Sequence, residues 1–187
     1  DHECRLVVGE SASAVTPPCT LDVRPGLEAR EAAPVELYDL VEDFAPDVVH
    51  VHNLVNPAVL EWAALRPSAL LTVQDHRFFC PTRGKWTPAG EVCRRPMMRE
   101  VCASCFDDQA YFRGVHALTE RRLSSARRLP LTVLSRYMRE ELVAAGAPPR
   151  RVHVVPPFVR RLDAGAAPSG PPCVLFVGRL AEAKGVR

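Results

Sequence analysis

Four of the seven cysteines lie within one 26-residue segment, and their spacing reads Cys-x12-Cys-x8-Cys-x2-Cys. These four are Cys80, Cys93, Cys102 and Cys105. A Cys-x2-Cys pair is the usual half of a tetrahedral zinc site, and two further thiolates complete the ligand set. We therefore expect one structural zinc ion here. The alternatives are an iron–sulfur cluster, or thiols that are free or joined in disulfides. The remaining cysteines are expected to be small buried apolar side chains, namely Cys4, Cys19 and Cys173.

Three polar residues, Gln74, Asp75 and His76, follow directly on the apolar run Ala69–Val73. The Gln74 amide can hydrogen-bond a hydroxyl group but cannot carry a proton at neutral pH, whereas His76 can do both. The segment is therefore a candidate reaction site. The plainer alternative is an acidic strand end beside a histidine that packs in the core.

Near the end of the chain, Gly178 and Arg179 follow another apolar run, and Lys184 comes five residues later. Ligands of open α/β sheets bind in the crevice beyond the carboxyl ends of the strands. A glycine there lets a ligand approach the backbone, and two cations suit a diphosphate. On residue types alone, two surface charges are the commoner explanation.

Short apolar runs alternate with amphipathic stretches, which predicts a parallel sheet covered on both faces by helices. Right-handed crossovers then give a doubly wound, Rossmann-like α/β fold. The expected strands cover 5–9, 47–52, 69–73, 131–134, 152–155 and 173–177. The expected helices cover about 34–44, 57–65, 109–128 and 136–145. Asn56 and Ser135 are expected to cap two of these helices, and Gly146 to end the last one.

The cysteines belong to a long loop, 74–108, and a loop of that length inside a compact domain is usually functional or cross-linked. The aromatic residues in and after it are expected to pack in the core; stacking on a sugar or anchoring at a membrane surface is the alternative. These are Trp86, Tyr111 and Phe112. Residues 161–172, rich in Pro, Gly and Ala, are expected to form a linker.

Several of these strings resemble family 4 glycosyltransferases. Val174–Leu180 with Lys184 looks like the first strand and loop of the family's donor-binding domain. Pro46–Asn53 is similar to the strand that brings a histidine to the cleft, and Val133–Pro156 is similar to the strand, helix and strand before the interdomain linker. Thr72–Pro81 resembles a segment that usually reads Thr, apolar, His, Asp and ends in Cys-Pro. In this chain Gln74 stands at the histidine position and His76 comes two places later.

The resemblance implies a GT-B fold, in which two Rossmann-like domains face each other across a cleft. Residues 1–160 would be most of the acceptor-side domain without its first strand, and 173–187 the start of a truncated donor domain. The intact enzyme would transfer a sugar from a nucleotide diphosphate sugar to a hydroxyl of a glycan, lipid-linked or small-molecule acceptor. Retention of the anomeric configuration is expected. We expect this chain to be inactive alone.

Residue roles follow from the resemblance. Gly178, Arg179 and Lys184 would bind the donor phosphates. Asp75, with Gln74 or His76, would be catalytic near the anomeric carbon. The acceptor side would be lined by His52 and Asn53. The family uses cationic side chains where other glycosyltransferases use a divalent ion, so no catalytic metal is expected.

Charge is unevenly distributed: the net charge is only +2, but residues 77–139 hold 13 Lys and Arg against 5 Asp and Glu. This segment could contact anionic partners, including the inner face of a membrane, although solvated helix faces explain it equally well. No run is long enough to span a bilayer and none resembles a signal peptide, so a cytoplasmic location is expected. Two other functions remain open: a sugar-nucleotide epimerase on the same fold, and a zinc-containing nucleic-acid-binding module. The α/β alternation weighs against nucleic acid as a partner.

Overall fold

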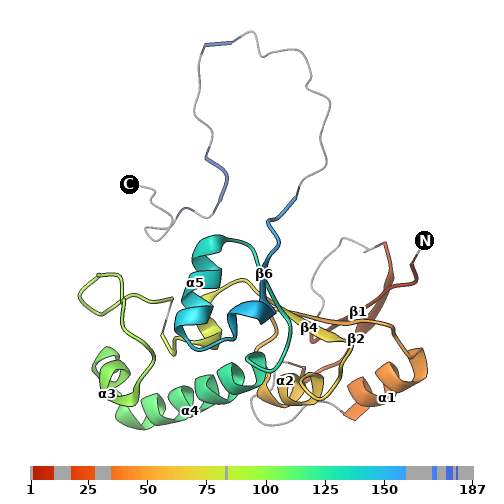
Figure 1. The fold of residues 1–187 in the computed structure, drawn as a ribbon, viewed down its shortest axis with the longest axis horizontal. Coiled ribbons are helices and arrows are strands. Elements are labelled where there is room, and N and C mark those ends of the chain that lie inside the picture. The colour runs from red at the N-terminus through yellow and green to blue at the C-terminus, as the bar shows by residue number, and fades with distance from the viewer. Residues whose placement is uncertain are drawn as a thin grey trace. The chain divides into compact units, whose positions relative to one another are not determined.

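The computed structural model describes residues 2–10, 18–27, 35–82 and 84–158, and beyond these residues 170–171, 176–178 and 180. The chain divides into two units, Asp1–Pro157 and Phe158–Arg187. The described helices and strands belong to the first unit (Figure 1).

The described strands form two sheets, and every strand pair is parallel. One sheet has the order β1-β2 and the other β3-β4-β5-β6. The strands are β1 (Arg5–Val8), β2 (Thr20–Val23), β3 (Val49–His52), β4 (Ala69–Val73), β5 (Leu131–Val133) and β6 (Val152–Val154). Parallel strands joined by helices confirm the predicted Rossmann-like α/β class.

The helices lie between the strands in the chain. They are α1 (Val35–Phe44), α2 (Pro57–Ala63), α3 (Arg99–Cys102), α4 (Gln109–Ala126) and α5 (Arg136–Ala144). Single 3₁₀ turns are η1 (His76–Phe78), η2 (Ala103–Cys105) and η3 (Pro149–Arg151). Figure 1 shows α2 and α4 side by side, with α5 next to β6.

One face of the larger sheet makes the core. Val51, Leu71 and Leu131 are in register on β3, β4 and β5, and all three are buried. They pack in one apolar cluster with side chains of α2, α4 and α5, among them Leu60 and Leu142, which are fully buried. Burial of such side chains is the main stabilising contribution to the fold.

The opposite face of this sheet is polar. Thr72 and Thr132 lie in register there, and Thr72 Oγ1 is 2.6 Å from both Thr132 Oγ1 and His50 Nε2. Successive side chains of a strand point to opposite faces, so in the Val-His-Val-His sequence of β3 the valines lie on the apolar face and the histidines on the polar face. Within the described residues, the apolar layer therefore covers one face of β3–β6.

Helix ends follow the predicted signals. The Asn56 side chain accepts hydrogen bonds from the first turn of α2, and Ser135 accepts one from Met138 N in α5. Asp108 caps α4 in the same way. Gly146 has φ 91°, the left-handed conformation that ends helices and that glycine adopts most easily.

One strand, and three short helical elements of the cysteine-containing loop, were missed in the sequence. The stretch containing Thr20–Val23 is a strand, β2, which pairs with β1. The cysteine-containing loop is also more ordered than expected, since it holds η1, α3 and η2. Residues 173–175 of the predicted strand and most of the predicted linker fall outside the described residues; the described end of that segment, Phe176 and Val177, is exposed and not in a strand, so this part of the prediction is wrong.

Candidate functional site

The residues that follow β3 and β4 meet at one edge of the sheet, because these strands are parallel neighbours. Asp75 is held there by two partners. Asn53 Nδ2 donates to its Oδ2 at 3.0 Å, and Arg77 donates from its backbone nitrogen (2.9 Å) and from Nε (2.9 and 3.0 Å). Asp75 thus joins the end of β3 to the turn η1.

These contacts also determine the charge of Asp75. Burial acts to raise the pKa of its carboxyl group, but the hydrogen bonds from Arg77 and Asn53, with the charge of Arg77, bring the pKa below its usual value. The group is a carboxylate at neutral pH. Both oxygens already accept hydrogen bonds from the protein, so Asp75 is well placed to position Asn53 and Arg77.

A second polar pair, His52 and Gln74, lies beside this group. Gln74 Nε2 is 3.3 Å from His52 Nε2, and the Gln74 backbone nitrogen donates to Asn53 Oδ1 at 3.1 Å. Asn53 has φ 50°, a left-handed conformation that asparagine tolerates better than most residues. His52 and Gln74 are exposed, so both can reach a ligand.

His76, one of the two candidates for the role of the histidine absent from position 74, faces α5. Its Nε2 is 3.3 Å from the Tyr137 hydroxyl, and its ring makes edge contacts with Phe79 and Tyr137. Burial lowers the pKa of the His76 imidazole, and nearby Lys85 lowers it further, against opposing contributions from Glu141 and Asp75. His76 is therefore a neutral side chain that anchors η1 to α5.

A cleft of about 820 Å³ opens next to the Asp75 group. Asn53 and Arg77, the two partners of Asp75, both lie in its wall. The remaining described lining residues come from the end of β3, the cysteine-containing loop and α4: Leu54, Val55, Cys80, Pro81, Thr82, Trp86, Thr87, Pro88, Cys105, Phe106, Tyr111, Val115 and Arg122. A concave site with aromatic side chains and a few fixed polar groups is typical of small-molecule binding.

The aromatic prediction is correct for one residue of three. Phe112 is buried, at 1% exposure, and its ring packs against Phe106. Trp86 and Tyr111 are 53% and 51% exposed and line the cleft instead. Arg77 and Arg122 also line the cleft and were not singled out from the sequence.

Comparison with known proteins identifies the fold that carries this cleft. Residues 5–157 match the family model described as the glycosyl transferase 4-like domain. The chain belongs to the glycosyl transferase 4-like family. No curated protein and no solved structure gave a significant match. Family membership confirms the resemblance seen in the sequence and makes this chain a glycosyltransferase domain.

In this glycosyltransferase domain, part of the arginine-rich segment has a structural role. Arg122 Nε donates to the Val55 carbonyl at 2.6 Å, and Arg139 Nε donates to the Val152 carbonyl at 3.3 Å. Arg121 forms an ion pair with Glu61. No described helix is long and apolar enough to cross a membrane.

The donor-side residues cannot be placed in the same way. Arg179 and Lys184 lie outside the described residues, and Gly178 is described and exposed. Their role in binding donor phosphates stays a prediction.

The four clustered cysteines of the glycosyltransferase domain lie near one another. Burial raises the pKa of the Cys102 thiol, and the neighbouring thiols of Cys80, Cys105 and Cys93 raise it further. Cys80 Sγ accepts a hydrogen bond from Lys85 N at 3.4 Å, and Lys85 O accepts one from Cys93 N at 2.6 Å. In the part of the chain that the structure describes, no three His, Cys, Asp or Glu side chains are already arranged to hold a metal ion.

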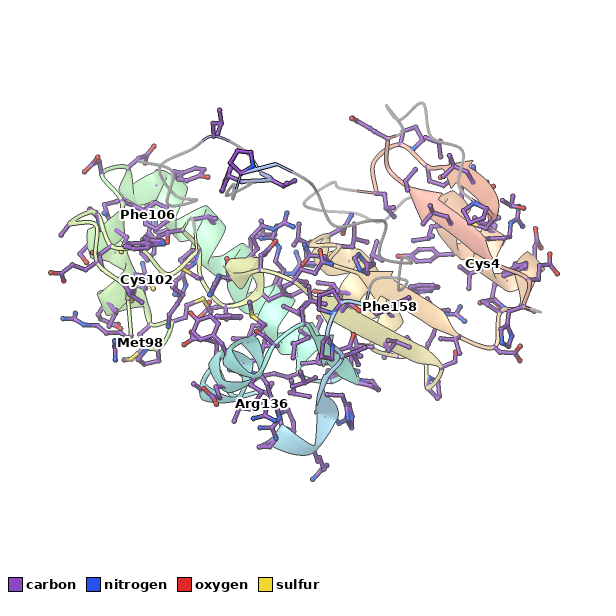
Figure 2. The ribbon with its side chains drawn as sticks, turned by 90° about the horizontal axis from the view of Figure 1, so that it is seen from above. Cys4, Met98, Cys102, Phe106, Arg136 and Phe158 are labelled. Carbon is purple, nitrogen blue, oxygen red and sulfur yellow. The ribbon has the colours of Figure 1, made fainter. Side chains whose placement is uncertain are left out.

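The remaining cysteines differ from expectation. Cys4 is exposed, so its prediction as a buried side chain is wrong, and Cys19 is only partly buried. Cys173 lies outside the described residues. Figure 2 shows Cys4 at the opposite end of the view from Cys102.

The zinc site stays a prediction, and metal analysis tests it. If the four thiols bind zinc, protein purified without chelator contains about one zinc per chain, and Cys102→Ser lowers that ratio. Cys4→Ser is the matched control and should leave the ratio unchanged, since Cys4 is remote from the cluster. Metal-free protein with four freely titrating thiols would reject the site.

Proposed function

We propose that this domain forms the acceptor side of an enzyme that transfers a sugar from a nucleotide diphosphate sugar to a hydroxyl group of a glycan, lipid-linked or small-molecule acceptor. The observation that carries the proposal is the cleft beside Asp75, with Asn53 and Arg77 in its wall. It lies after β3 and β4, at the carboxyl edge of the sheet, where α/β proteins bind ligands.

The reaction joins the acceptor oxygen to C1 of the donor sugar. The bond between C1 and the phosphate oxygen breaks, its electron pair goes to the departing diphosphate, and the acceptor proton leaves with that diphosphate. We propose that the configuration at C1 is retained. The transition state carries positive charge on the sugar and negative charge on the diphosphate, so catalysis requires fixed charges near both.

Asp75 and Asn53 would act on the acceptor side of this reaction. The ionised Asp75 holds Asn53 and Arg77 in fixed positions, and its negative charge favours an oxocarbenium-like sugar nearby. His52 and Gln74 are exposed beside them and can hydrogen-bond acceptor hydroxyls. Arg179 and Lys184, with the backbone at Gly178, would bind the donor phosphates.

Two experiments on the full-length protein test this function. In the first, a panel of nucleotide sugars is screened for release of nucleoside diphosphate. One donor should be consumed, release should rise when an acceptor is present, and NMR of the product should show the donor's anomeric configuration.

The second distinguishes the epimerase alternative. An epimerase would convert the sugar of a nucleotide sugar without acceptor and without net release of nucleoside diphosphate. That outcome, or failure to consume any nucleotide sugar, would contradict the proposed transfer.

A further inference from the structure

Two arginine side chains lie in the wall of the cleft, and one of them, Arg77, forms an ion pair with Asp75 beside it. The other is Arg122, and none of the described lining residues is Asp or Glu. Arginine is the side chain best suited to bind phosphate and carboxylate groups, because its planar guanidinium presents several donors at once.

Both arginines are tied to one short segment, residues 53–55. Arg77 shares the Asp75 carboxylate with Asn53, while Arg122 Nε donates to the Val55 carbonyl at 2.6 Å. Arg77 is thus connected to Asn53 through Asp75, and Arg122 is bonded directly to Val55, two positions further along the chain. Side chains already fixed by such contacts lose less conformational entropy when they bind a ligand.

Trp86 reaches the cleft from an ordered hairpin. Trp86 and Val92 form an antiparallel bridge. Thr87 N donates to Glu91 O at 2.9 Å, which closes the hairpin. The adjacent Lys85 forms an ion pair with Glu141 of α5 at 3.3 Å, and both side chains are mostly buried, with exposures of 12% and 23%.

Tyr111 comes from the first turn of α4 and packs 6.1 Å, between ring centroids, from Phe106. About half of Trp86 and of Tyr111 remains exposed although both are attached to ordered elements. An exposed aromatic ring with a polar edge offers an apolar face to the C–H groups of a sugar ring.

We propose that the cleft binds an acceptor sugar that carries a phosphate or a carboxylate, with the anionic group at Arg77 and Arg122 and the sugar ring against Trp86 and Tyr111. This inference rests on the proposed function, because it names the acceptor class of the same site. Hexose phosphates and hexuronic acids share the chemistry, and the experiment separates them.

The test measures binding by calorimetry to the full-length protein, with saturating nucleoside diphosphate present to occupy the donor site. The probes are a hexose 1-phosphate, a hexuronic acid and a neutral methyl hexoside. The anionic probes should bind at least about tenfold more tightly than the neutral one, and the preference should weaken as salt is raised. The tighter of the two anionic probes identifies the charged group.

Substitutions then assign the preference to the cleft. Arg77→Gln should reduce the preference for anionic over neutral probes to within about threefold, and Arg77→Lys should restore part of that preference. Trp86→Ala should weaken the binding of all three probes alike, by about tenfold. Arg94→Gln, an exposed arginine of the same loop that does not line the cleft, is the matched control and should change nothing.

Equal affinity for neutral and anionic probes would overturn the inference, as would an Arg77→Gln effect of equal size on both. Loss of anionic binding when nucleoside diphosphate is added would also overturn it, since the cleft would then hold the donor. These results leave the proposed function standing if donor consumption is observed. Conversely, an anionic preference without donor consumption would contradict the proposed function and not the binding site.

Discussion

Replacing Asp75 by asparagine is expected to lower kcat/KM for transfer by about 100-fold in the full-length enzyme. Asparagine has nearly the same shape but no charge, so Arg77 loses its ion pair and one carboxylate oxygen becomes an amide that cannot accept from Asn53 or Arg77. Displacement of groups around a reacting centre by about 1 Å costs rates of this order. Initial rates at varied donor and acceptor concentrations measure the effect.

Because Asp75 positions groups of the acceptor cleft, the KM for acceptor should rise while the KM for donor changes little. Asp75→Glu should recover part of the activity by restoring the charge. Asp39→Asn, at an exposed position on α1, is the control and should be as active as the wild type. A variant Asp75→Asn with near-normal kcat/KM would remove Asp75 from the site.

The largest effect on stability is expected for Phe78→Ala. Phe78 is the last residue of η1 and directly follows Arg77, and its side chain is fully buried in the main core. Truncation of a buried phenylalanine leaves a cavity and typically costs about 3–5 kcal/mol of the free energy of unfolding. Urea unfolding followed by the fluorescence of Trp62, on α2 of the same unit, reports the loss.

Phe78→Leu, which fills most of the space, should cost less than about 1.5 kcal/mol. Leu65→Ala is the control for truncation alone: Leu65 is 72% exposed, so its loss should change the free energy of unfolding by no more than about 0.5 kcal/mol. A loss of less than about 1 kcal/mol for Phe78→Ala would show that η1 is not held by the core.

Much of the fold could be predicted because its signals are local. The apolar run Ala69–Val73 has the bounds of β4, and the caps Asn56 and Ser135 act as expected. β2 was missed because Thr20–Val23 is short and its side chains are mostly exposed, so neither periodicity nor burial marks it in the sequence. Its pairing with β1 is a contact between segments and has no local signal.

The site was predicted less completely because part of it depends on contacts between segments that are far apart in the sequence. Asp75 and Gln74 were found because they follow an apolar run and match a segment of the family, and Asn53 was found through the family resemblance alone. Arg122 lies 67 residues from Val55 along the chain, and only the packing of α4 brings it to the cleft. Trp86 resembles a core residue by type, and its exposure depends on how the hairpin is anchored to α5.

The most direct test of the account is whether the full-length protein moves a sugar onto an acceptor through this cleft. Mass spectrometry of an acceptor incubated with the donor that supports nucleoside diphosphate release should show the gain of one sugar residue. Product should form in a one-to-one ratio with nucleoside diphosphate for the wild type and the Asp39→Asn control, and fall about 100-fold with Asp75→Asn. Release of nucleoside diphosphate without any glycosylated acceptor, or equal product from the Asp75→Asn variant, would contradict the account.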